Sequence, residues 1–136
     1  MRIARAALDA VQAHAAEGYP YEICGMLAGP KGGSTVTRAV RAVNDVKDRA
    51  RDTYRIHPDE HRRIEREVDE AGDEILGYYH SHPEHPARAS IRDTEQAWPR
   101  AFYLIVSCVR GQVTESNVFV SDDWQQPMKQ QPIEIV

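Results

Sequence analysis

The sequence predicts one mixed α/β domain of the α+β type, spanning residues 1–136. Apolar residues recur at helical spacing in some segments and form short or alternating runs typical of strands in others. They make up 41% of the chain and charged residues 28%, a composition typical of a globular protein with one core. No internal repeat or linker-like stretch divides the sequence, so we expect a single domain.

The first part of the chain predicts a helix followed by a β-hairpin. Apolar residues recur at helical spacing over Ile3–Ala16, and Gly18 would end that helix. Ile23–Ala28 is a short apolar run, which is typical of a buried strand. The turn sequence Lys31–Ser34 then leads into Thr35–Val43, whose alternation predicts the partner strand of a hairpin.

A polar loop and a second helix are expected next. Asn44–Arg51 is polar and predicts a loop, and a short extended piece follows around Tyr54–Ile56. A helix over Pro58–Ala71 is favoured because proline suits the first helical position. Ile64 and Val68, four residues apart, would form its buried side.

The second half predicts strands around one short helix. The strands expected from apolar and alternating runs are Glu74–His80, Phe102–Val109, Val113–Val120 and an edge strand in Met128–Val136. Ser81–Ala89 is rich in Pro and His and predicts a stiff loop, after which Ser90 begins a short helix to about Ala97.

The overall charge argues against a nucleic-acid partner. Lys and Arg number 17 and Asp and Glu 21, which gives a formal net charge of −4. Proteins that bind nucleic acid usually carry a basic surplus or a basic stripe. The densest basic run, Lys47–Arg55, is interrupted by Asp48 and Asp52, so we interpret it as a solvated loop.

The sequence also predicts a cytoplasmic protein that does not enter a membrane. The residues after Arg2 and Arg5 form an amphipathic pattern rather than the apolar centre of a signal peptide. No window approaches the roughly 20 apolar residues of a membrane-spanning helix. Cys24 and Cys108 lie in apolar runs and are too few for a disulfide framework, so we expect two buried free thiols.

Two histidines and an aspartate have the spacing of a metal site. His80 and His82 are two residues apart at the end of a strand, so both side chains point to the same face and can converge on one ion. Asp93 follows after a loop that can return the chain to the same place. Two His and one Asp leave a fourth position open for water, the pattern of a catalytic zinc rather than a structural one.

Each part of this pattern also has a plain structural explanation. Histidines at strand ends often make only hydrogen bonds. Ser90-x-x-Asp93 by itself is the sequence of a helix N-cap with an acid at its third position. The two explanations are compatible, because a capped helix would project Asp93 from its first turn toward the strand end. Glu22, taken alone, is a surface acid at the start of a strand.

The stretch His80-x-His82-x7-Ser90-x2-Asp93 resembles the signature of the JAMM (MPN+) metalloproteases at every fixed position and spacing. Glu22, in YEICGMLAG, stands where that family carries its catalytic glutamate. Flanking residues that also look like the family are Gly77, Ser81 and Pro83. The resemblance covers roughly residues 6–120 and is strongest to small stand-alone bacterial and archaeal members.

The resemblance implies an MPN-like domain, with a curved, mainly antiparallel sheet flanked by two longer helices and a short helix that carries Asp93. It also implies that His80, His82 and Asp93 bind Zn²⁺, which activates a water in the fourth position. Glu22 would take a proton from that water and return it to the leaving amine. Ser90 would donate a hydrogen bond to the oxyanion of the tetrahedral intermediate.

Family members hydrolyse the bond that follows the C-terminal Gly-Gly of ubiquitin or a ubiquitin-like protein, so the resemblance implies a partner of that kind. This chain lacks the long insertions with which eukaryotic members hold ubiquitin chains. We therefore expect a small ubiquitin-like sulfur carrier, released from a protein or from an amino acid such as cysteine. Two alternatives stay open: a zinc amidohydrolase acting on small amides or cell-wall peptides, and a non-catalytic MPN scaffold that binds partners.

Five further side chains are expected to be structural. We interpret His57, His61 and His85 as surface residues, Tyr78 as core packing beside the site, and Trp98 as packing under the short helix.

Overall fold

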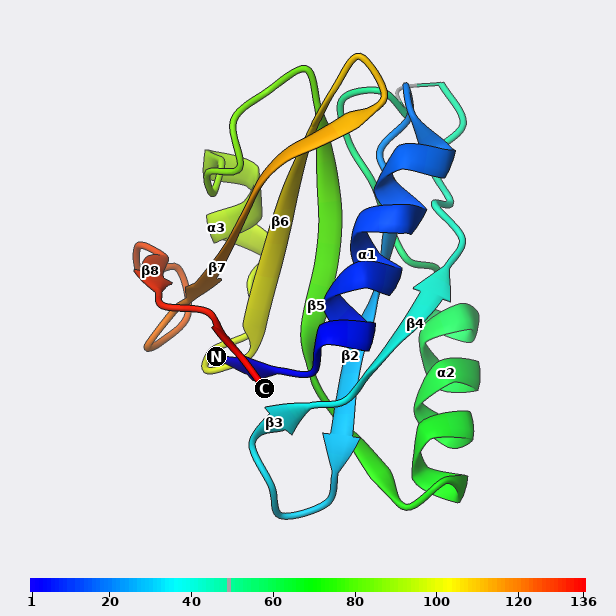
Figure 1. The fold of residues 1–136 in the computed structure, drawn as a ribbon, viewed down its shortest axis with the longest axis vertical. Coiled ribbons are helices and arrows are strands. Elements are labelled where there is room, and N and C mark those ends of the chain that lie inside the picture. Colours follow the sequence, from blue (N-terminus) through cyan, green and yellow to red (C-terminus); the bar gives the residue numbers. More distant parts are fainter. Residues whose placement is uncertain (49) are drawn as a thin grey trace.

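The computed structural model describes residues 1–48 and 50–136, and within these residues six strands form the main sheet. They are β2 (Cys24–Pro30), β4 (Arg38–Ala42), β5 (Asp73–Pro83), β6 (Phe102–Val109), β7 (Gln112–Val120) and β8 (Lys129–Gln131). Their order across the sheet is β4-β2-β5-β6-β7-β8 (Figure 1). Only the central pair, β5 and β6, is parallel within this sheet, so the predicted, mainly antiparallel architecture is confirmed.

A small parallel sheet joins the two chain ends. It consists, in the described residues, of β1 (Arg2–Ile3) between β3 (Thr35–Val36) and β9 (Glu134–Ile135). The helix predicted to begin at Ile3 was therefore wrong at its start, because Ile3 pairs with Val36 and Ile135 as a strand. The predicted partner strand Thr35–Val43 is likewise divided between β3 and β4. The edge strand predicted in Met128–Val136 is divided between β8, at the edge of the main sheet, and β9, in this small sheet.

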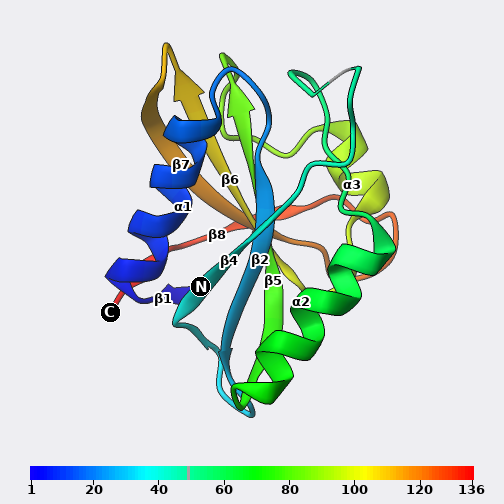
Figure 2. The ribbon, with the colours of Figure 1, turned by 90° about the vertical axis from the view of Figure 1, so that its right-hand side faces the viewer.

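The helices cover both faces of the main sheet (Figure 2). Helix α1 (Arg5–Gly18) packs on one face, and α2 (Pro58–Glu70) and α3 (Ile91–Gln96) lie on the other. Helix α2 begins as predicted, with Pro58 in its first turn, and the His57 ring accepts a hydrogen bond from the Asp59 N–H at 3.0 Å. Among the helices of residues 1–48 and 50–136, none has the length and apolarity needed to cross a bilayer.

Alternation along the strands divides the core between the two faces. The α1 face buries Tyr79, Leu104 and Val106 together with residues of the helix, chiefly Ala7, Leu8, Val11 and Ala15. The α2 face buries Cys24, Met26 and Ala28 against Ile64 and Val68. Because side chains alternate, His80 and His82 point away from α1 and toward the face where α3 lies.

Two glycines allow β5 to lie close to its neighbours. A Cβ on Gly77 would come within 2.2 Å of the Phe102 carbonyl oxygen on β6, and a Cβ on Gly25 of β2 would come within 2.3 Å of the Tyr79 ring. Any side chain at either position would push β5 away from its neighbours. The central position of the histidine-bearing strand therefore depends on both.

The segment that was predicted as a loop, Asn44–Arg51, contains neither helix nor strand in its described residues. Arg49, which belongs to this loop and to the basic run Lys47–Arg55, lies outside the described residues. The neighbouring piece Tyr54–Ile56 has no strand pairing but packs its apolar side chains against the α2 face.

Candidate active site

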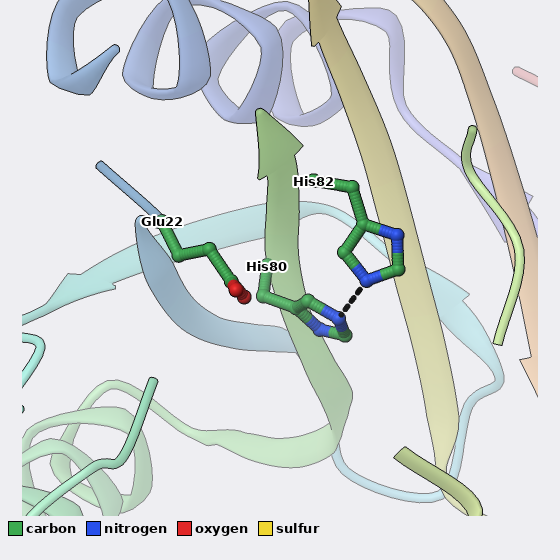
Figure 3. Close-up of side chains that lie close together, drawn as sticks. All are labelled: Glu22, His80 and His82. Carbon is green, nitrogen blue, oxygen red and sulfur yellow. Dashed lines mark hydrogen bonds between the residues drawn. The ribbon is translucent and has the colours of Figure 1, made fainter. Parts of the chain in front are cut away.

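His80 and His82 converge at one end of β5. Strand β5 continues to Pro83, so the prediction that it ends at His80 was too short and both histidines lie within the strand. Their two Nε2 atoms are 3.1 Å apart (Figure 3). Residues two apart on a strand share a face, and this places both rings on the side of α3.

Asp93 reaches the same point from the first turn of α3. Its Oδ1 lies 3.2 Å from His80 Nε2, and its Oδ2 lies 3.5 Å from His82 Nε2. A capping box fixes this position: the Ser90 N–H donates to Asp93 Oδ2 at 2.8 Å, and the Asp93 N–H donates to Ser90 Oγ at 3.0 Å. The predicted N-cap is thus confirmed, and the same contacts aim Asp93 at the two histidines.

The three side chains fit a zinc ion. Ligands about 2.0–2.1 Å from a tetrahedral zinc are roughly 3.3 Å from one another, close to the separations observed between these atoms. The His82 Nδ1–H donates to the Pro86 carbonyl at 2.9 Å, which leaves the Nε2 lone pair of a neutral ring facing the site. His80 is fully buried and its ring stacks on Tyr54 with centroids 4.5 Å apart.

One polar atom of the site lacks a partner. The Nδ1 of His80 is buried and has no hydrogen-bond partner among the described residues. The polar contacts of this buried ring are therefore made through Nε2, with the other two candidate ligands. With both rings neutral and protonated at Nδ1, the two Nε2 lone pairs and the Asp93 carboxylate would face one another, and such a set of acceptors suits a bound metal.

Glu22 joins the histidines from the start of β2. The sequence separation of Glu22 and His80 did not show that they meet, and the fold brings them together because Ile23 pairs with Ser81. The Ile23 N–H donates to Ser81 Oγ at 3.0 Å, and the Ser81 N–H donates to the Ile23 carbonyl at 3.1 Å. Glu22, His80 and His82 each offer a ligand atom, and these atoms lie within 4.8 Å of one another (Figure 3).

The environments of the titratable groups differ sharply. Burial raises the pKa of Glu22 to about 8, and the nearby Asp93 charge adds to this effect while His82 opposes it. Burial alone would also raise the pKa of Asp93, but hydrogen bonds with His80 and His82 outweigh it and hold that pKa far below its usual value. Asp93 is therefore ionised, while Glu22 is placed to hold or release a proton near neutral pH.

The pKa values of His80 and His82 are shifted in opposite directions. Burial lowers the pKa of His80. Burial would also lower the pKa of His82, but its contacts with Asp93 and the Pro86 carbonyl outweigh burial and raise it.

A pocket of about 520 Å³ opens beside these residues. Its lining includes the predicted Glu22, His82, Ser90 and Asp93, and also residues that the sequence did not indicate, namely Asp52, Thr53, Tyr54, Arg88, Arg92 and Gln96. No motif marks these six, because they come from separate loops and from α3. Only the repeated Arg residues around Ser90 and Asp93 offered a signal.

The other histidines and aromatic residues differ in part from expectation. His85 is exposed, as predicted, whereas His61 is half-buried and its Nε2 contacts the Tyr78 hydroxyl at 2.9 Å.

Trp98 does not pack under α3: it is 56% exposed and contacts the equally exposed Trp124, with ring centroids 5.1 Å apart. Cys24 and Cys108 are buried and free, as predicted.

Comparisons with known proteins identify a family and several relatives. The family described as prokaryotic homologs of the JAB domain matches residues 4–123. A desampylase of Haloferax volcanii is 40% identical over 112 residues, which cover 79% of this chain and 80% of that protein. A CysO-cysteine peptidase of Mycobacterium tuberculosis is 32% identical over 131 residues, which cover 86% of this chain and 88% of that one.

Solved structures share the fold over the whole chain. A Desulfitobacterium hafniense protein known from a solution structure has a TM-score of 0.80 at 26% identity, covering 99% of this chain and 92% of that one. A JAB1/MPN domain protein of Archaeoglobus fulgidus has a TM-score of 0.62 at 16% identity, covering 100% and 99%. The second likeness shows that the fold is MPN-like.

The MPN-like α+β fold and these relatives together define a JAMM-type peptidase. The match over residues 4–123 identifies the family in particular. The chain belongs to the prokaryotic homologs of the JAB domain.

Proposed function

We propose that this peptidase is zinc-dependent and hydrolyses the bond after the C-terminal Gly-Gly of a ubiquitin-like protein or sulfur carrier. The observation that carries the proposal is the convergence of His80, His82 and Asp93, whose nearest polar atoms are 3.1 to 3.5 Å apart, with Glu22 beside them. The names of two relatives, a desampylase and a CysO-cysteine peptidase, support a small ubiquitin-like or sulfur-carrier partner.

In this proposal His80, His82 and Asp93 hold the zinc. A bound Zn²⁺ supplies a Lewis acid that polarises the scissile carbonyl and lowers the pKa of a water. We assign Asp93 rather than Glu22 as the third ligand because both Asp93 oxygens are within 3.5 Å of a histidine Nε2 and the Ser90 N–H fixes one of them. The requirement for a third, negatively charged ligand is then met without Glu22.

Glu22 is free for proton transfer in this assignment. Its buried carboxylate takes a proton from the attacking water, whose oxygen forms a bond to the carbonyl carbon of the last glycine. The same carboxyl then gives the proton to the amine nitrogen as the C–N bond breaks. The products are the Gly-Gly carboxylate and a free amine, so atoms and charges balance without a further reactant.

Ser90 is the residue that we assign to the oxygen of the scissile carbonyl. Its Oγ accepts a hydrogen bond from the Asp93 N–H, which occupies a lone pair and leaves the hydroxyl hydrogen available. No acceptor for that hydrogen is present among the described residues, and Ser90 lines the pocket. We propose that it donates to the oxygen as negative charge develops in the transition state.

The test is cleavage by the zinc-loaded protein of three Gly-Gly-tailed substrates: a linear extension, a lysine isopeptide and a cysteine adduct, each compared with small amides and cell-wall peptides. We expect hydrolysis after Gly-Gly and little hydrolysis of the small compounds. Efficient cleavage of small amides, with every Gly-Gly substrate left intact, would instead favour an amidohydrolase.

We further propose that residues 1–136 form one domain and that the peptidase is cytoplasmic. Continuous pairing from β4 to β8 supports a single domain, because the first and last parts of the chain share one sheet. The two free cysteines support a reducing compartment, where thiols persist.

A further inference from the structure

The site adjoins two hollows with different linings. The first, called the Glu22 pocket, has a volume of about 520 Å³, and its charged lining residues are Glu22, Asp52, Asp93, Arg88 and Arg92, beside His82 and His85. The second, called the Trp98 groove, has a volume of about 390 Å³ and is rich in aromatic residues, namely Tyr54, Tyr78, Trp98 and Tyr103. Arg92 and Asp93 line both, so the two hollows meet at Asp93, one of the candidate metal ligands.

The position of Glu22 indicates on which side of the site the leaving group of the substrate lies. Glu22 lines the Glu22 pocket and is not among the residues that line the Trp98 groove. In the proposed function Glu22 protonates the leaving amine, and a general acid must come within hydrogen-bond distance of that nitrogen. The leaving group therefore lies in the Glu22 pocket.

Arg88 and Arg92 bring positive charge to this pocket. Both side chains line it, and neither forms an ion pair with a carboxylate within the residues that the structure describes. The charge of Arg92 acts across the pocket on Glu22, whose pKa it lowers against the larger effect of burial. Three acids also line the pocket, but a bound dication and the two arginines would together carry four positive charges against their three negative ones, so the lining would favour an anion.

Both arginines are exposed, but the backbone around them is fixed. Ala87, next to Arg88, is fully buried: its N–H donates to Glu115 Oε1 at 2.7 Å, and its carbonyl accepts from Asn117 Nδ2 at 3.0 Å. Arg92 lies inside the capping box formed by Ser90 and Asp93. A fixed backbone reduces the entropy that a ligand must overcome when it orders these side chains.

We propose that Arg88 and Arg92 form a carboxylate subsite in the Glu22 pocket and that the preferred leaving group is a free amino acid. An amino acid places its α-carboxylate one carbon away from the amine nitrogen, and a guanidinium group binds a carboxylate with paired N–H donors. A lysine side chain in an isopeptide has no such negative charge next to its amine. The inference rests on the proposed function, because Glu22 marks the side of the leaving group.

The test uses two tail peptides that differ in one charge. Both carry the Gly-Gly tail of the carrier extended by one alanine, which ends in a free carboxylate in the first and in a carboxamide in the second. A third substrate joins the tail to a lysine side chain. The kcat/KM of each is measured for the zinc-loaded protein and for the variants Arg88→Gln, Arg92→Gln and the double variant, with Arg66→Gln on the outer face of α2 as the matched control.

We expect the carboxylate peptide to be cleaved about 10-fold faster than the carboxamide, the size of one good charge-assisted contact. Each glutamine variant should reduce this preference and the double variant should abolish it, because kcat/KM falls more for the carboxylate peptide than for the carboxamide. Calorimetry on the Glu22→Gln background, where turnover is expected to be about 10²-fold slower or more, should show the same preference in binding. Arg66→Gln should match the unsubstituted protein.

Two outcomes separate this inference from the proposed function. Equal cleavage of the two peptides, or faster cleavage of the lysine isopeptide, would overturn the carboxylate subsite and leave the peptidase proposal intact. If none of the three Gly-Gly substrates is cleaved, the proposed function is overturned and this inference with it.

Discussion

Two carboxylates of the candidate site carry the same charge in water but have opposite environments in the fold. Asp93 accepts hydrogen bonds from the Ser90 N–H and faces two imidazole rings, so its pKa is lowered despite burial. Among residues 1–48 and 50–136 the Glu22 carboxylate has no comparable set of hydrogen-bond partners, and burial raises its pKa to about 8. This division suits one group that binds a cation throughout and another that exchanges a proton.

The substitution Glu22→Gln tests the division. Glutamine keeps the size of the side chain but cannot accept a proton, so we expect a loss of turnover on the order of 10²-fold or more, with zinc content unchanged. Single-turnover cleavage and elemental analysis of the same preparation measure both quantities.

Glu95→Gln on α3 is the matched control, because Glu95 is exposed and outside the pocket lining. It should leave turnover and zinc content unchanged. Loss of zinc from the Glu22→Gln protein would show that Glu22 is a ligand and would reverse the assignment of the two carboxylates.

Ser90 is expected to affect both stability and turnover. Ser90→Ala removes the acceptor of the Asp93 N–H and should cost roughly 1 kcal/mol of unfolding free energy. It should also lower kcat by about 10²- to 10³-fold, the scale for one oxyanion donor. Urea denaturation and steady-state kinetics measure the two effects separately.

Ser90→Thr keeps a hydroxyl that can both cap and donate, and it should recover most of the stability and part of the turnover. If Ser90→Ala unfolds more easily but turns over at the normal rate, Ser90 is only a cap.

At the scale of elements, β5 contributes side chains to both faces of the sheet. Its residues alternate between the α1 face, where Tyr79 is fully buried, and the opposite face, where His80 and His82 meet Asp93. The Tyr79 hydroxyl contacts His14 Nδ1 of α1 at 2.8 Å. Docking of α1 and the position of the histidines are thus connected through one strand.

His14 should make the docking of α1 sensitive to acid. Burial lowers the pKa of His14 from 6.5 to about 4, the nearby Arg41 charge adds to this, and Glu17 opposes it. As the pH falls, His14 is therefore protonated in the unfolded chain before it is protonated in the folded one. Its contribution to the free energy of unfolding is fully present above pH 6.5, is lost as the pH drops toward 4, and does not change further below that. Each pH unit within this window lowers the free energy of unfolding by about 1.4 kcal/mol, so we expect a total loss on the order of 3 kcal/mol.

Urea denaturation of the unsubstituted protein and of His14→Gln, at several pH values from 7 to 4, measures this contribution. The variant lacks the titrating group, so its stability should fall less over this range. Parallel pH profiles for the two proteins would show that His14 is not the cause.

At the scale of the whole molecule, the candidate metal site joins three separate parts of the chain. Glu22 precedes β2, the two histidines lie near the end of β5, and Asp93 lies on α3. A cation bound to groups that are close only in the folded state stabilises that state. A cation bound there would therefore stabilise the fold as well as take part in the proposed chemistry.

The purified protein should contain about one zinc per chain, and at 100 times its Kd the ion adds about 2.7 kcal/mol of stability. Removal of zinc with a strong chelator should therefore abolish activity and lower Tm by roughly 10 °C. Elemental analysis and a thermal melt before and after chelation measure both.

Asp93→Asn is the variant to compare, because its amide oxygen can still accept from the Ser90 N–H and so keeps the cap. It should bind zinc much more weakly and lose the zinc-dependent rise in Tm. Full zinc occupancy in this variant would contradict the assignment of Asp93 as a ligand.

The sequence alone determined most of the elements and the candidate ligand set. Strand β6 and helix α2 were predicted almost to the residue because their apolar spacing and the proline at the start of α2 are local signals. The pair Ser90 and Asp93 was predicted as a cap for the same reason, and the structure has that cap.

The sequence did not determine the contacts that depend on distant partners. Ile3 entered a strand because Val36 and Ile135 flank it, and Trp98 faces solvent beside Trp124, neither of which can be inferred from neighbouring residues. Likewise, the sequence did not indicate that Arg88 and Arg92 line the same pocket as Glu22. Local patterns specify helices, strands and caps because these form between near neighbours, whereas pockets and strand partners follow from how the whole chain packs.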